Sequence, residues 1–442
     1  MHICRRWRRI VFVSQQFLHL QLFCTPRTPV LNPLGCWPAT LPIVVQYGGS
    51  IALEPPGPKD EDNIMTALMQ SGRVSSISLT VTSSLLNKLS AIERPFLELE
   101  NLVLLSRDGL PPILPIAFLW GPRLRRLHLT GVTFPPLRLL QLLYFSRNIV
   151  DLQLHEVVDP QILSPRILKN ALSRMSQLRS LSLHFLFATD HIGVLLASTK
   201  RVVLPALTRL NFRGIADYLE DLVARIDAPR LGDIEVTIFN ESFFELSKLS
   251  EFINRTEMHK SHRRADILLS EHAFSISMTQ PGASTYITLQ LFCESLPTQL
   301  FFLNRICIHF SAFLFKVEDL CIRTAGQSLA TWGGSGPWLR PLNPFTCVKQ
   351  FHVIGSNSTN IVRALQLPDR WRQKVLPALH KHLIPQLGPH MREAVVSLMV
   401  SRRLSGHPIT VEYEPLYHIS EPGGIGTMSA QCHHYHSLTR LK

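Results

Sequence analysis

One apolar pattern returns along much of this 442-residue chain at a nearly constant interval. Each copy has two apolar residues separated by one position, with a third apolar residue three positions before them. The seven copies begin at Val74, Leu99, Leu124, Ile149, Leu178, Leu207 and Leu231, in steps of 25, 25, 25, 29, 29 and 24 residues. Because side chains alternate between the two faces of a strand, the closely spaced pair lies on one face. Such a strand cannot bury that face alone, so the copies are expected to stack.

This period is typical of leucine-rich repeats, and the fold class expected here is an α/β solenoid of that kind. We assign the regular repeats to residues 71–240. Apolar residues at helical spacing in 217–225 predict a helix between two of the strands. No asparagine follows the triplets at the position where many leucine-rich repeats carry one, so the stack is expected to be irregular and less curved.

Residues 241–415 are expected to continue the solenoid with longer repeats. Triplets beginning at Tyr286, Val317 and Val348 support this, and the alternation around Phe274 predicts a strand that would supply a degenerate copy. The apolar segment 300–315 contains Arg305, which favours a buried helix over a membrane span. Residues 243–253 are predicted to be a helix, 326–345 a surface loop, and 416–442 a polar, disordered tail.

Composition limits the classes of function. The net charge is +13, but the basic residues are scattered and lack interleaved aromatics, so nucleic acid is not an expected partner. No convincing signal peptide or membrane segment is present, and none of the eight cysteines forms a C-x-x-C pair. These features favour a cytoplasmic or nuclear protein with reduced, buried thiols.

The first residues carry a second, weaker signal. The segment Cys4-Arg5-Arg6-Trp7-Arg8-Arg9-Ile10-Val11, followed by alternating leucines, resembles the last helix of an F-box. We assign 1–50 to a partial, helical F-box-like segment and 51–70 to an acidic, Pro-rich linker. With the repeats that follow, the chain resembles fungal F-box proteins with degenerate leucine-rich repeats. A counterpart of the first F-box helix is missing, which implies either a truncated gene model or lost docking.

That resemblance implies a substrate-recognition subunit of a cullin-type ubiquitin ligase. The F-box would dock a Skp-type adaptor, with Trp7, Ile10 and Val11 as adaptor-binding residues, while the repeats hold the target protein. Those three residues could equally cap the repeat core. The alternative function is a leucine-rich-repeat interaction scaffold that has lost ligase docking.

If the triplets are strands, the residues that alternate with the buried ones form an open concave face, a common binding surface of solenoids. The candidate partner-binding residues are Arg126, His128, Asp151, Gln153, His155, His184, Arg209, Asn211 and Arg213. The plain alternative is a face that is polar only for solubility. His155 and His184 hold equivalent positions on neighbouring repeats, whereas His128 is out of register with them, so no metal site is expected.

Catalysis is not expected either. The chain contains no Gly-x-Ser-x-Gly elbow, no Walker loop and no His-Glu-x-x-His motif. The run Gly333-Gly334-Ser335-Gly336 lacks the lysine of a phosphate-binding loop. We therefore predict a non-enzymatic protein without a cofactor.

Overall fold

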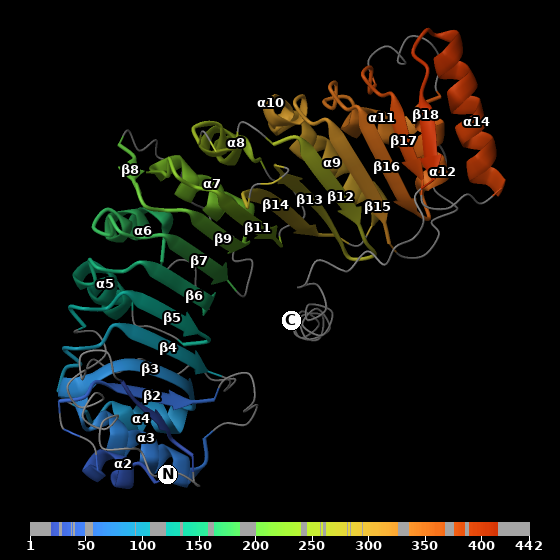
Figure 1. Cartoon of the computed structure of the whole chain (residues 1–442). Coiled ribbons are helices and arrows are strands. Elements are labelled where there is room, and N and C mark those ends of the chain that lie inside the picture. The colour runs from blue at the N-terminus through green and yellow to red at the C-terminus, as the bar shows by residue number, and fades with distance from the viewer. Residues whose placement is uncertain are drawn as a thin grey trace, which may run out of the picture.

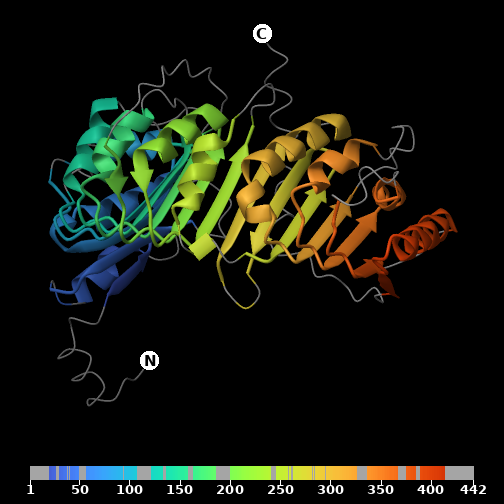
Figure 2. The same ribbon diagram turned by 90° about the horizontal axis from the view of Figure 1, so that it is seen from above.

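The computed structural model shows an arc built on one long sheet, with helices along its outer side and strands facing the inner, concave side (Figure 1). Seen from above, the helices form a layer over one face of the sheet (Figure 2). The structure describes residues 19–25, 29–36, 38, 40–48, 56–92, 94–106, 121–132, 136–157, 163–185, 200–239, 245–256, 258–259, 262–280, 282, 284–293, 295–325, 336–366, 375–384 and 389–413.

Within the described ranges, the main sheet has sixteen strands in the order β1-β2-β3-β4-β5-β6-β7-β9-β11-β14-β13-β12-β15-β16-β17-β18. The strands are β1 (Leu20–Phe23), β2 (Ile43–Tyr47), β3 (Val74–Val81), β4 (Asn101–Ser106), β5 (Arg126–Thr130), β6 (Asp151–Val157), β7 (Ser180–Phe185), β9 (Arg209–Gly214), β11 (Asp233–Ile238), β12 (Arg264–Leu269), β13 (Ala273–Thr279), β14 (Tyr286–Phe292), β15 (Asp319–Thr324), β16 (Gln350–Gly355), β17 (Lys381–Ile384) and β18 (Thr410–Tyr413). A separate pair joins β8 (Val202–Val203) and β10 (Ile226–Asp227).

The helices of the arc lie between these strands in sequence. They are α2 (Leu31–Cys36), α3 (Pro58–Leu68), α4 (Ser83–Leu89), α5 (Pro136–Phe145), α6 (Pro165–Leu172), α7 (Ala216–Arg225), α8 (Ser247–Asn254), α9 (Leu296–His309), α10 (Ser311–Leu314), α11 (Gly336–Leu342), α12 (Ser358–Ala364) and α14 (Pro389–Leu404). This confirms an α/β solenoid whose sheet is mostly parallel.

The predicted strands of the regular repeats are confirmed residue by residue. Their second triplet members are register partners across successive strands and form one continuous row, none of it exposed: Ile77, Leu102, Leu127, Leu152, Leu181, Leu210 and Ile234. The first triplet members are also buried, at the turn that enters each strand. Because each side chain in the row fits between two neighbours, every repeat completes the core of the next.

Neighbouring helices are joined by a buried carboxylate. Glu220 on α7 accepts hydrogen bonds from the backbone N–H groups of Lys248 (2.7 Å) and Leu249 (2.8 Å) at the start of α8. These N–H groups have no partner inside their own helix, so the side chain acts as a cap from the preceding repeat. Burial raises the pKa of Glu220 to about 7. The interaction fixes α8 against α7.

The order of strands reverses in the middle of the sheet. The chain leaves β11, forms β12, returns antiparallel as β13, and turns again into β14, which pairs with β11. The predicted strand around Phe274 is confirmed as β13, but its assignment as a degenerate copy of the repeat is wrong, because it runs antiparallel between β12 and β14 whereas the strands of the repeats are parallel. The alternating pattern does not encode strand direction.

Later repeats follow the expected triplets. β14 contains the whole triplet that begins at Tyr286, whereas β15 and β16 contain the second and third members of theirs, and the first members Val317 and Val348 are buried just before these strands. The buried helix expected near 300–315 is α9 followed by α10. The surface loop predicted for 326–345 is wrong for its described part, 336–345. There, α11 buries Trp338 and Leu342, and Phe345 is fully buried beyond its end.

The N-terminal expectations need correction. Within 1–50, the described residues do not form a helical F-box-like unit: β1 and β2 pair with each other, and β2 pairs with β3, so they extend the solenoid sheet. The alternating leucines of 18–22 fit a strand better than a helix because their period is two. Within 51–70, α3 buries Ile64, Ala67 and Leu68, and is not an exposed linker. Trp7, Ile10 and Val11 lie outside the described residues, as does the tail 416–442.

Candidate functional site on the concave face

All nine residues predicted for the concave face lie on the strands β5, β6, β7 and β9. Register places them in rows that cross the strands. One row is formed by Arg126, Asp151, Ser180, Arg209 and Asp233, and the next by His128, Gln153, Ser182, Asn211 and Glu235. None of these side chains belongs to the hydrophobic core, because each alternates with a buried leucine or its equivalent. The rows therefore form a continuous polar surface.

Three histidines meet on this surface. The rings of His155 and His184 are stacked with centroids 3.8 Å apart and an angle of 5° between planes. This confirms that the two residues hold equivalent positions. His128 pairs in register with Gln153, as expected, but its ring still approaches His155 edge-on at 5.1 Å. The prediction that His128 is out of register with the other two histidines is confirmed, yet its ring reaches them because residues two positions apart on neighbouring strands share a face.

A bulge in β6 follows this cluster. The register between β6 and β7 shifts between Leu154 and Val157, and Glu156 takes a left-handed conformation with φ of 57°. Such a conformation is uncommon for residues other than glycine. The backbone carbonyl of His155 accepts a hydrogen bond from Gly131 N–H at 3.1 Å. The last pair before the shift is Leu154–Leu183 and pairing resumes at Val157–Phe185, so His155 lies within the bulge.

A chain of polar contacts runs from the histidines to β11. His155 Nε2 lies 2.8 Å from Ser182 Oγ, which lies 3.4 Å from His184 Nε2. His184 Nε2 also lies 3.2 Å from Asn211 Oδ1, and Asn211 Nδ2 donates to Glu235 Oε2 at 3.4 Å. Four neighbouring strands are therefore connected through side chains. This network orders the polar face before any ligand binds.

The cluster favours neutral imidazoles. Burial, then His184, His128 and Arg213, lower the pKa of His155 to about 3. Burial, with a further contribution from Arg213 and His128, lowers the pKa of His184 to about 4. Burial also lowers the pKa of His128, against the opposing effect of Asp151. Near neutral pH these rings are hydrogen-bonding groups without charge.

The cluster does not have the geometry of a metal site. Two rings lie face to face, and the Nε2 atoms of both His155 and His184 are directed to the Ser182 hydroxyl. In the described part of the chain, no three His, Cys, Asp or Glu side chains are grouped so that they could hold a metal ion. A zinc site would need its ligands to converge on one point.

Next to the histidines, Arg213 carries the local positive charge. Its guanidinium lies 5.0 Å from the centre of the Phe239 ring, which stacks on Phe292 at 5.7 Å. The two phenylalanines were not predicted for the site. Phe239 follows directly after β11 and Phe292 ends β14, so only the reversed strand order brings them together. A cation over an aromatic face is stabilised by about 0.5–1 kcal/mol at exposed sites.

Charge is distributed unevenly along the face. Toward the C-terminal end, Arg264 pairs with Asp266 (2.9 Å) and His352 with Asp319 (3.3 Å). On the N-terminal side, Arg209 is 3.5 Å from Asp233. Arg126 and Arg213 form no ion pair with any residue that the structure describes. The guanidinium groups of Arg126 on β5 and Arg213 on β9 are therefore available to bind a ligand.

We expect the stacked histidines to make the protein sensitive to acid. Their folded-state pKa values lie below the unfolded value of about 6.5, so between these values the unfolded chain binds more protons. The two histidines therefore leave stability undiminished above about pH 6.5 and lower it as the pH drops. Replacing His155→Gln and His184→Gln together should reduce the loss between about pH 7 and 5 by roughly 1–2 kcal/mol, after allowance for solvent screening.

Urea unfolding of the wild type and of the double histidine variant, each at about pH 7 and pH 5, measures this difference in the loss of stability. His259 and His382, whose pKa values burial also lowers, remain in both proteins and cancel. Equal pH dependence of the two unfolding free energies would contradict the stacked, half-buried arrangement of His155 and His184.

Among the helices that the structure describes, none combines the length and apolar character needed to cross a membrane.

No family model matches the sequence, and no curated protein matches it. Among solved structures, the leucine-rich-repeat-containing protein LegL7 from Legionella pneumophila is similar at 11% identity over 86% of this chain and 97% of its own, with a TM-score of 0.28. An internalin from Listeria monocytogenes is similar at 13% identity over 79% of this chain and 83% of its own, also with a TM-score of 0.28. The sequence period and the stacked parallel strands, independently of these distant matches, make the fold a leucine-rich-repeat-like solenoid.

Proposed function

We propose that this protein is a non-enzymatic interaction scaffold that binds a protein partner on its concave face. The observation that carries the proposal is the ordered polar surface of β5 to β11, where hydrogen-bonded histidines adjoin Arg213, which forms no ion pair within the described residues. A solvated face needs polar groups but does not need them connected across four strands. Prior ordering lowers the entropic cost of binding.

The chemistry of this face fits a protein surface with mixed character. Neutral imidazoles, Gln153 and Asn211 can exchange hydrogen bonds, Arg126 and Arg213 can pair with carboxylates, and Phe239 and Phe292 add apolar area. Arginine and aromatic residues are enriched where interfaces gain most of their affinity. The site therefore suits a folded or extended polypeptide better than a small apolar ligand.

Site-specific photocrosslinking tests the proposal. A benzoylphenylalanine at Gln153, on the concave face, should form an adduct of defined mass in cell extract, and Arg213→Glu should abolish it. The same group at Asn170, exposed on α6, is the matched control on the outer side. Equal adducts from Asn170, or adducts from Gln153 that persist in the Arg213→Glu variant, would contradict binding at this face.

The finer proposal is that the scaffold acts as the substrate-recognition subunit of a cullin-type ubiquitin ligase. Its support is the resemblance of residues 4–11 to the end of an F-box, placed just before the first strand of the solenoid. Capture of a purified Skp-type adaptor and cullin by the full chain, lost in Trp7→Asp and Ile10→Asp, is the expected result. Failure of the wild-type chain to bind the adaptor would leave the scaffold without ligase docking.

A further inference from the structure

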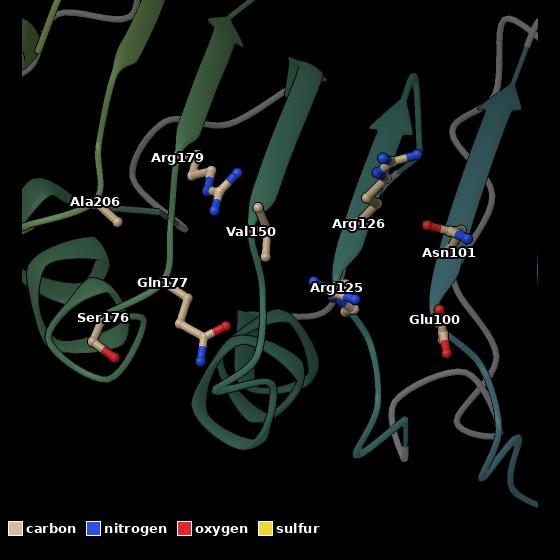
Figure 3. Close-up of a pocket in the computed structure, with 9 residues that line it drawn as sticks. All are labelled: Glu100, Asn101, Arg125, Arg126, Val150, Ser176, Gln177, Arg179 and Ala206. Carbon is tan, nitrogen blue, oxygen red and sulfur yellow. The ribbon is translucent and has the colours of Figure 1, made fainter.

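A polar pocket of about 450 Å³ lies where the chain enters the strands β4 to β7, at one edge of the concave sheet. Three arginines line it: Arg125, Arg126 and Arg179 (Figure 3). Asn101, Ser176 and Gln177 add neutral polar groups, and Glu100 is the acidic residue of the lining. All three arginines are exposed. The pocket is therefore open to solvent and carries an excess of positive charge.

The backbone holds two of these arginines in a fixed relation. The backbone N–H of Arg125 donates to the carbonyl oxygen of Glu100 at 2.8 Å. In the same way, Val150 N–H donates to the Arg125 carbonyl and Arg179 N–H donates to the Val150 carbonyl, both at 2.7 Å. Arg125, Val150 and Arg179 thus occupy equivalent places at the starts of three neighbouring strands (Figure 3). Two strand spacings separate the arginines by about 10 Å, with the shorter Val150 between them.

The guanidinium groups of the pocket have no partner inside the described part of the protein. Neither a salt bridge nor a side-chain hydrogen bond engages Arg125, Arg126 or Arg179 there. Asp151, the register neighbour of Arg126, instead receives Gln153 Nε2 at 3.2 Å on both carboxylate oxygens. Nearby arginines behave differently, since Arg123 binds Glu98 and Arg209 pairs with Asp233. The charge in this pocket is thus left available.

We infer that this pocket binds an acidic segment of the protein partner, through two or more carboxylates spaced along an extended chain. One guanidinium can bind both oxygens of one carboxylate. The three guanidinium groups of the pocket can therefore bind more than one carboxylate. The separation of about 10 Å between Arg125 and Arg179 corresponds to roughly three residues of extended polypeptide. Asn101 and Gln177 lie beside them and can bind the backbone of such a segment. That the partner is a protein rests on the proposed function, and the pocket adds that the bound segment of this partner is acidic.

Fluorescence anisotropy with the full chain tests this assignment. The probe is a labelled Gly-Ser-Glu-Ser-Glu-Glu-Ser-Gly peptide, and its control has glutamine at each glutamate. The Arg125→Gln, Arg179→Gln double variant should weaken binding of the acidic peptide by roughly tenfold or more, since each lost contact is a charge-assisted hydrogen bond. Arg403→Gln, an exposed arginine on the distant helix α14, should leave binding unchanged.

Three results would overturn the inference. Arg403→Gln could weaken binding as much as the pocket variant, which would indicate a general charge effect. The glutamine peptide could bind as well as the acidic one. Inorganic phosphate could bind while the acidic peptide does not, which would assign the pocket to a free anion. If Gln153 still formed crosslinks in any of these cases, the proposed function would stand without the pocket assignment. If the pocket bound the acidic peptide but Gln153 formed no crosslinks, the acidic-peptide site would stand and the proposed function would not.

Discussion

Leu181→Asp should abolish the cooperative folding of the solenoid. Leu181 is fully buried in β7, where it lies in register between Leu152 of β6 and Leu210 of β9. An aspartate there would either be an unpaired buried charge or require protonation, at a cost of several kcal/mol. Each repeat completes the core of its neighbour, so we expect the loss to spread along the sheet. Circular dichroism and urea unfolding would measure it.

Arg209→Ala is the matched control for this experiment. Arg209 lies next to Leu210 on the same sheet but faces solvent, and its pairing with Asp233 is partly exposed. Exposed ion pairs contribute at most about 1 kcal/mol, so the unfolding free energy should change by roughly half a kcal/mol. If the two variants lost the same stability, the division of each strand into a buried and a polar face would be wrong.

Gly355→Ala should also be strongly destabilising, for a backbone reason. Gly355 ends β16 with φ of 109°, and a Cβ there would lie 1.9 Å from the carbonyl oxygen of Thr324 on β15. Thr324 cannot move freely, because its hydroxyl accepts the N–H of Asn357 at 3.1 Å. Unfavourable φ and the clash together should cost about 3 kcal/mol or more. Thermal unfolding of the full chain measures the effect.

Gly406→Ala separates the two causes. Gly406 also has a positive φ, of 79°, but a Cβ there would meet nothing within 4 Å. It should therefore show only the conformational penalty, about 1 kcal/mol. A loss at Gly355 no greater than that at Gly406 would mean that β15 and β16 can separate at this point without cost.

Much of the fold could be predicted because one physical rule governs it. The alternation in Leu127-x-Leu129 and its equivalents fixes which side chains are buried, and the constant step fixes how strands stack. The same rule located the concave face, since residues such as Gln153 and Asn211 must lie opposite the leucines. Periodicity was also sufficient to identify α7 and, among the later strands, β13, β14, β15 and β16.

The rest depends on contacts that no local pattern records. Strand direction is set by pairing, so the antiparallel course of β13 was not accessible from its alternating residues. In the same way, the meeting of Phe239 with Phe292 follows from the reversed order. The F-box resemblance implies a helix near the N-terminus, whereas Leu20 and Leu22 have the period-two spacing of the strand that they form. Arg125 and Arg179 stand one position before the strands, outside the alternation that defined the site.

The reversed strands at the centre give the molecule a different kind of connectivity there. In the regular half, sheet partners are about 25 residues apart, whereas Asp233 pairs with Tyr286 and Arg264 pairs with Asp319, at roughly twice that separation. Closing each longer loop costs about 0.6 kcal/mol more, and each depends on the β12–β14 meander being complete. Removing one parallel repeat from an arm would leave neighbours that can still stack, whereas removing any one of β12, β13 and β14 would leave the central strands without their pairing partners.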